Sequence, residues 1–143
     1  MDKYAKVEKL LSNYKMLKIS IENIEEDIKL IEEETGLKGI SFDGISTSPT
    51  NKTSDIVADT VLAKSEKIGY LKRTIENNQR KIDSVDRALE GLEKLERSVV
   101  IEKYVNAKQW WQVASVVCYS ESWCKQLRKR AIDKLVIGIY GVK

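Results

Sequence analysis

The residues best suited to chemistry lie near the C-terminus, in the stretch YSESWCKQLRKRAIDKL at positions 119–135. Its middle holds four basic side chains, Lys125, Arg128, Lys129 and Arg130, close to serine and glutamine residues. Lysine and arginine neutralise phosphates, while serine, glutamine and lysine hydrogen-bond the edges of bases. The stretch is therefore either a helix that enters a DNA groove or the solvated end of a core helix.

The spacing of apolar residues decides which side chains such a helix would present. A helix capped by Ser120 would turn a stripe inward, formed by Cys124, Leu127, Ala131 and Leu135. The opposite face then carries Ser122, Gln126, Lys129 and Asp133, flanked by Lys125 and Arg130, with Trp123 and Arg128 at its sides. We expect base contacts from Ser122, Lys125 and Gln126, phosphate contacts from Arg128 and Arg130, and a contact from Lys129 deeper along the groove or at its rim. The flank position of Trp123 suits either packing on the first helix of the domain or lying along the DNA backbone.

A second short helix is expected just before this one. Residues 108–117 place Trp110, Val113, Ala114 and Val117 on one face. Cys118 and Tyr119 would form the turn between the two helices. Two short helices joined by a tight turn, the second capped by serine, are typical of a helix-turn-helix.

The rest of the chain consists of two long helical patterns that must carry this element. Residues 3–34 follow three-and-four apolar spacing as one helix, whose heptad shortens once between Tyr14 and Ile21. Glycines, the single proline and a Ser/Thr cluster predict a flexible linker at 36–54. Residues 55–96 form a second helix with a seven-residue seam from Val57 to Leu92, interrupted by Lys64 and Asn78.

So narrow a seam needs a partner helix. The first helix could fold back on it as an antiparallel hairpin, but we favour pairing with a second chain in a four-helix bundle. We therefore expect an all-α fold: a long helical hairpin or coiled coil at 1–96 that drives homodimerisation, followed by a helix-turn-helix domain at 97–143.

Charge is distributed unevenly along the chain. The net charge is +3, but residues 94–143 carry ten Lys/Arg against four Asp/Glu, which is +6, and leave −3 for residues 1–93. A basic C-terminal third indicates a polyanionic partner such as double-stranded DNA. Ordinary variation of surface charge is the alternative.

Several classes of protein are disfavoured. The chain lacks histidine, a phosphate-binding glycine loop and a cluster of metal ligands, so we expect no enzyme, no cofactor and no metal site. Cys118 and Cys124 are expected to be small buried apolar residues. No apolar run approaches 18 residues and the N-terminus carries no signal-peptide core, so we expect a cytoplasmic protein of a bacterial host cell, away from membranes.

The stretch LERSVVIEKYVNAKQWWQVASVVCYSESWCKQLRKRAIDKL resembles region 4 of the sigma-70 family. The shared features are Arg97, Tyr104, the Val113-Ala114 pair, Ser120, Ala131 and Leu135. The likeness is closer to small phage-encoded late-gene activators of the ArpU/RinA type, which Trp110 and Tyr119-Ser120 fit. It covers roughly residues 92–136, and Cys118 replaces the glycine usual at the turn.

This resemblance implies a sequence-specific transcriptional regulator of phage or prophage genes that binds duplex DNA and contacts RNA polymerase. It does not imply an autonomous sigma factor, because a promoter-melting region has no counterpart here. The alternative is a small terminase subunit that recognises viral DNA for packaging. A dimer would favour the regulator, and a ring of eight or more chains would favour packaging.

Overall fold

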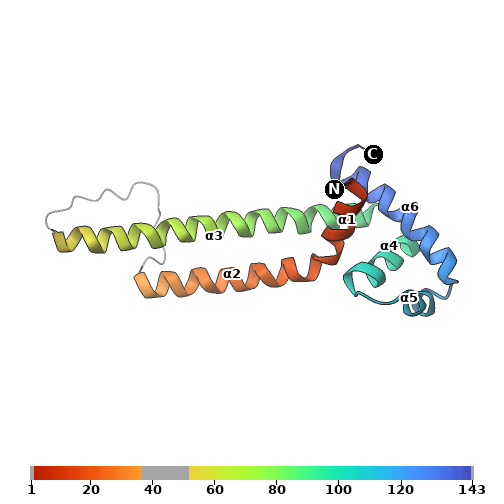
Figure 1. Cartoon of the computed structure of the whole chain (residues 1–143), viewed down its shortest axis with the longest axis horizontal. Helices are drawn as coiled ribbons and strands as arrows, with labels where there is room; N and C mark the ends of the chain where they lie inside the picture. Colours follow the sequence, from red (N-terminus) through yellow and green to blue (C-terminus); the bar gives the residue numbers. More distant parts are fainter. Residues whose placement is uncertain (1, 37–51, 143) are drawn as a thin grey trace. The chain divides into compact units, whose positions relative to one another are not determined.

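The chain is all-helical, as predicted, in a computed structural model that describes residues 2–36 and 52–142, with side chains described outside 52–59. The described residues contain no strand. The elements, drawn in Figure 1, are α1 (Lys3–Ser12), α2 (Tyr14–Thr35), α3 (Lys52–Glu90), α4 (Lys94–Val100), the π-helix η1 (Ile101–Val105), α5 (Trp110–Val117) and α6 (Glu121–Tyr140). The expected linker at 36–54 falls largely on residues 37–51, outside the described part.

The helices form two compact units. Unit 1 combines Met1–Lys18 with Gln79–Lys143, and unit 2 is Ile19–Asn78. This division differs from the expected boundary at 96/97, because α1 packs against α6 and η1. The first eighteen residues therefore share a core with the C-terminal helices.

The expectation of one unbroken helix over 3–34 is wrong. The helix stops at Asn13, which has φ −90° and ψ −1° and separates α1 from α2. The break lies next to Tyr14, where the apolar repeat shortens. Asparagine is disfavoured in helix interiors because its side-chain amide competes for the hydrogen bonds of the backbone. The break lets Val7 and Leu11 of α1 join the core of unit 1.

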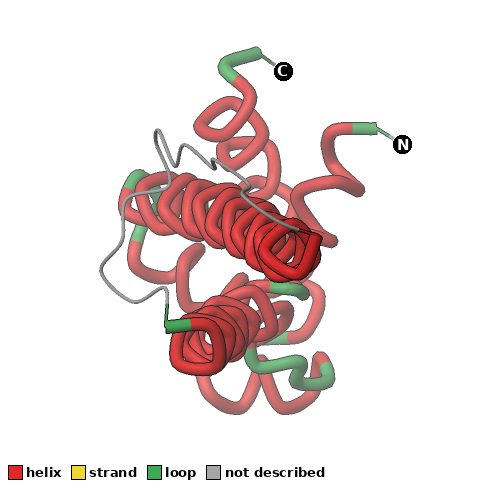
Figure 2. The backbone as a smooth tube through the Cα atoms, turned by 90° about the vertical axis from the view of Figure 1, so that its left-hand side faces the viewer, coloured by secondary structure: helices red, strands yellow, loops and turns green. Residues whose placement is uncertain are grey.

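Unit 2 contains most of α2 and the N-terminal part of α3, which run antiparallel and lie side by side in Figures 1 and 2. Ile28 and Ile68 are buried between the two helices. Both polar interruptions of the seam have partners across the pair: Lys64 Nζ lies 3.0 Å from Glu34 Oε1, and the Asn78 amide donates to Ser20 Oγ at 3.0 Å. Within the described residues, α2 thus supplies a partner for the seam inside the same chain.

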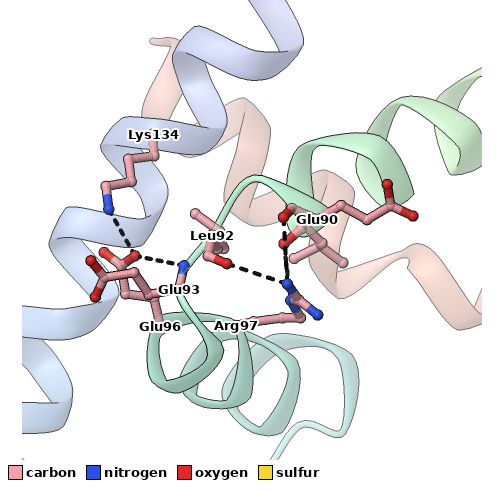
Figure 3. A network of polar contacts seen from close by, with 7 residues as sticks. Glu90, Leu92, Glu93, Glu96, Arg97 and Lys134 are labelled. Atoms are coloured by element: carbon pink, nitrogen blue, oxygen red, sulfur yellow. Dashed lines mark hydrogen bonds and ion pairs between the residues drawn. The ribbon is translucent and has the colours of Figure 1, made fainter.

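The expected helix over 55–96 is also wrong at its C-terminal end. α3 ends at Glu90, and α4 begins at Lys94 after a turn at Gly91 and Leu92. Arg97 bridges the turn: its Nε donates to the Leu89 carbonyl at 3.0 Å, and one terminal nitrogen reaches the carbonyls of Glu90 and Leu92 (Figure 3). The guanidinium thereby satisfies carbonyls that the end of a helix leaves without a helical donor.

An ion pair between a buried glutamate and a half-exposed lysine ties α4 to α6. Glu96 is only 2% exposed, and its Oε1 accepts from Lys134 Nζ at 2.8 Å and from the Glu93 backbone N–H at 3.1 Å (Figure 3). This hydrogen bond with Glu96 raises the pKa of Lys134. A buried carboxylate needs such partners to remain charged.

The main core of unit 1 draws on nearly all of its helices. Its buried members are Val7, Leu11, Val85, Leu89, Leu92, Val100, Tyr104, Ala131, Ile132, Leu135 and Val136. Tyr104, at the end of η1, also donates a hydrogen bond to Glu8 Oε2 of α1 at 2.6 Å. This core fixes α6 between α1 and α4 and so orients its remaining faces.

Candidate nucleic-acid interface

The candidate interface is built on α5, α6 and the turn that joins them. α5 ends at Cys118, which adopts a left-handed conformation with φ 62° and ψ 38°. Ser120 caps α6, as expected, because its Oγ accepts from the Trp123 backbone N–H at 3.1 Å. The left-handed backbone conformation of Cys118 is the one that glycine adopts most readily.

The expectation of two buried cysteines is right for one and wrong for the other. Cys124 is fully buried, and burial raises the pKa of its thiol. Cys118 is exposed because it lies in the turn and not on a helix face.

The inner stripe of α6 agrees with the apolar spacing. Cys124 and Leu127 pack with Val99 of α4 and Val113 of α5 in a small cluster. Ala131 and Leu135 are buried in the main core, together with Ile132 and Val136, which the sequence analysis left out. The helix also runs on to Tyr140, so the apolar residues 136–140 that follow the stripe are helical as well.

Five of the seven candidate DNA-binding residues are exposed on the outer side of α6: Ser122, Lys125, Gln126, Lys129 and Arg130. Trp123 is half-buried and packs against the cluster around Val113, and the Arg130 guanidinium lies 5.4 Å from its ring centroid. Trp123 therefore packs against the cluster with one part of its side chain and interacts with the Arg130 guanidinium through its ring.

Arg128 lies farther inward than expected. It is half-buried, and its Nε is enclosed without a hydrogen-bond partner among the described residues. Its spacing explains this position, because Cys124, Ala131, Ile132 and Leu135 all lie three, four or seven residues away on one helical stripe. The same spacing was available in the sequence.

Arg128 faces Trp110, around which three cations gather. The Trp110 ring centroid lies 4.9 Å from Lys103 Nζ, 5.3 Å from the Arg128 guanidinium and 5.9 Å from Lys125 Nζ. We call these four residues the Trp110 cluster. Cations within about 6 Å of an indole face are attracted to it.

Lys103 is the member that the sequence analysis missed. It comes from η1, and the connection from η1 to α5 turns at Ala107, whose φ is 53°. Periodicity gives no sign of a π-helix or of a positive φ at alanine. The neighbouring Lys108 lies 2.6 Å from Glu102 Oε2, and the hydrogen bond between them lowers the pKa of Glu102. Lys108 is thus locally neutralised, whereas no ion pair within the described residues joins Lys103, Lys125 or Arg128 to a carboxylate.

The described part of the chain holds no group of three or more His, Cys, Asp or Glu placed to bind a metal ion. Across residues 2–36 and 52–142, no helix combines the length and apolarity needed to cross a membrane.

A family model described as "Protein of unknown function (DUF722)" matches residues 3–136. The chain belongs to the DUF722 family. The DUF722 match begins at the first residue of α1 and extends to Val136 in the buried part of α6, so it includes both units. No curated protein and no solved structure matches the chain.

Proposed function

We propose that the chain is a sequence-specific double-stranded DNA-binding protein that regulates transcription of phage or prophage genes. In this proposal α5 and α6 act as a helix-turn-helix of the sigma region 4 type, and the protein is not an enzyme. The observation that carries it is the outer side of α6, where Ser122, Lys125, Gln126, Lys129 and Arg130 are all exposed. This combination supplies both base-reading and phosphate-binding groups on one helix.

The charge of the two units supports a polyanionic partner for unit 1. Its segments carry eighteen Lys/Arg and ten Asp/Glu, a net charge of +8, whereas Ile19–Asn78 carries seven and twelve, a net charge of −5. The contrast is larger than the sequence halves suggested, because the basic first eighteen residues belong to unit 1. A strongly basic unit attracts DNA and speeds encounter with it.

The Trp110 cluster suggests where phosphates bind. Lys103, Lys125 and Arg128 carry like charges around one ring, so a phosphate close to all three would relieve their mutual repulsion. We assign phosphate contacts to Lys103, Arg128 and Arg130, base contacts to Ser122 and Gln126, and contacts of both kinds to Lys125, with Lys129 at the groove rim. Trp123 holds Arg130 in place.

Contacts with RNA polymerase and homodimerisation through the N-terminal helices are further parts of the proposal. The polymerase contact rests on the resemblance to sigma region 4. Homodimerisation was expected from the seam from Val57 to Leu92, but α2 already covers much of the described seam within the chain, so we do not place the contact between two copies there.

The test is selection of preferred duplexes from a random DNA library by the full chain, followed by binding measurements on variants. Gln126→Ala should lose about 1–3 kcal/mol of discrimination at one base position and keep its non-specific affinity. Arg130→Ala should weaken binding to every duplex alike, because a phosphate contact carries no sequence information.

The matched control is Arg73→Ala, which removes an exposed arginine from α3 in unit 2 and should change neither quantity. A library that yields no preferred duplex would contradict sequence-specific binding. Unchanged preference in Gln126→Ala together with unchanged affinity in Arg130→Ala would make α6 a solvated core helix.

A further inference from the structure

An open groove in unit 1 lies away from the candidate DNA-binding face. It has a volume of about 730 Å³ and is lined by parts of α1, α3 and the last turn of α6, together with Asn13 and Leu17. We call it the α1–α3 groove. It meets α6 only at Ile139 and Tyr140, whereas the candidate interface occupies residues 122–130.

The chemistry of the α1–α3 groove is that of a basic rim around an apolar floor. The charged side chains that line it in the described chain are all basic: Lys6, Lys9, Arg80 and Lys81. Leu10 and Ile139 contribute apolar floor. The phosphates of a DNA backbone would pair with the basic side chains of the rim but would leave the apolar side chains of the floor uncovered. An acidic helix with apolar side chains would satisfy both.

The chain itself carries such a helix face. In α2, Ile19 and Leu30 are 45% and 55% exposed although both are large and apolar. They lie eleven residues apart, close to three helical turns, so they point in the same direction. Glu22, Glu26 and Glu33 are exposed on that same face. Lys29 is also exposed beside these glutamates, so the face carries three acidic groups against one basic group, with two apolar anchors. It spans about 21 Å from residue 19 to residue 33.

We propose that the acidic face of α2 in one copy of the chain docks into the α1–α3 groove of a second copy. Ile19 and Leu30 cover the apolar floor, while the three glutamates meet the four basic side chains of the rim. This contact uses surfaces that the chain leaves exposed, and not the seam of α3, whose described apolar residues already pack inside the chain. It is independent of DNA binding by α6.

The physical nature of the contact sets its strength. Exposed ion pairs contribute little each and are screened by salt, so the two apolar anchors and the shape of the groove must contribute much of the affinity. We therefore expect association at tens of micromolar that weakens as salt is added. Reversing charges on one side should place like charges together, which is strongly unfavourable.

The test is sedimentation of the full chain and of two double variants. The groove variant is Lys9→Glu with Arg80→Glu, and the α2 variant is Glu22→Lys with Glu26→Lys. Each alone should associate at least about tenfold more weakly than the original chain, and a mixture of the two should recover association, because the glutamates introduced in the groove then meet the lysines introduced in α2. All four positions are exposed, so circular dichroism should show unchanged helix content.

Two controls match the charge changes at other positions. Lys67→Glu reverses an exposed lysine of α3 outside the groove, and Glu25→Lys reverses an exposed glutamate on another side of α2. Both should associate like the original chain. A chain that stays monomeric at tens of micromolar, or variants that associate as before, would overturn the proposal. So would a groove variant that loses DNA affinity while its self-association is unchanged.

Discussion

Tyr104 links the end of η1 to α1 through a single buried hydroxyl. Burial of the ring raises the pKa of Tyr104 above the usual tyrosine value near 10, and the hydrogen bond to Glu8 raises it further. The folded chain thus holds this proton more tightly than the unfolded chain. Its contribution to stability is complete below about pH 10 and is lost as the pH rises above that value.

Replacing this tyrosine should therefore flatten the alkaline loss of stability. Tyr104→Phe should lower the free energy of unfolding at pH 7 by about 1 kcal/mol, through loss of the hydrogen bond. Between pH 10 and 11 the free energy of unfolding of this variant should then fall less steeply with pH than that of the original chain. Tyr4 and Tyr14, whose pKa values are also raised by burial, should leave a residual slope. Urea unfolding followed by circular dichroism measures both effects, and parallel curves would contradict this account.

At the level of elements, Arg97 determines how α3 gives way to α4. Its guanidinium donates to three carbonyls at the end of α3 and the following turn. Arg97→Ala should lower the free energy of unfolding by about 1.5–3 kcal/mol, as hydrogen bonds from a charged group typically contribute that much. Thermal or urea unfolding measures the loss.

Two further substitutions serve as controls for Arg97→Ala. Arg97→Lys should recover little, because an ammonium group lacks the planar fork that reaches several carbonyls. Arg73→Ala, on the exposed side of α3, should change stability by less than about 0.5 kcal/mol. Equal losses in Arg97→Ala and Arg73→Ala would show that the carbonyl contacts contribute nothing.

Sequence patterns predicted the elements best where apolar spacing is regular. The stripe of Cys124, Leu127, Ala131 and Leu135 correctly oriented α6, and hydroxyl chemistry correctly identified Ser120 as its cap. The break at Asn13 was missed because the packing of α1 against α6 and η1 favours it. The end of α3 at Glu90 was missed because the hydrogen bonds of Arg97 to three backbone carbonyls stabilise it. Lys103 was missed because it reaches Trp110 through a π-helix and a positive φ at Ala107, neither of which has a periodic signature.

On the scale of the whole molecule, the contrast between a +8 unit and a −5 unit has a measurable consequence. If the five cations Lys103, Lys125, Arg128, Lys129 and Arg130 each neutralise one phosphate, the logarithm of the DNA association constant should fall with the logarithm of salt concentration with a slope of about −4.5. Fluorescence anisotropy with a labelled duplex measures this slope.

Variants show which cations account for the slope. Lys103→Ala should reduce it by about one unit, whereas Lys108→Ala should change it less, because Glu102 already neutralises Lys108. A slope near zero for the original chain would contradict phosphate binding by unit 1. Equal effects of the two lysine variants would contradict the assignment of the Trp110 cluster.

The different surroundings of the two cysteines offer an experimental handle. The thiol of Cys118 is exposed in the turn between α5 and α6, while that of Cys124 is enclosed and has a raised pKa. Because thiolates are the reactive species, a maleimide dye added to the native chain should attach at the turn and spare the interior. The unmodified sequence thus carries its own attachment point for a fluorescent reporter a few residues from Ser122 and Lys125, where the proposed binding of a duplex should change the emission.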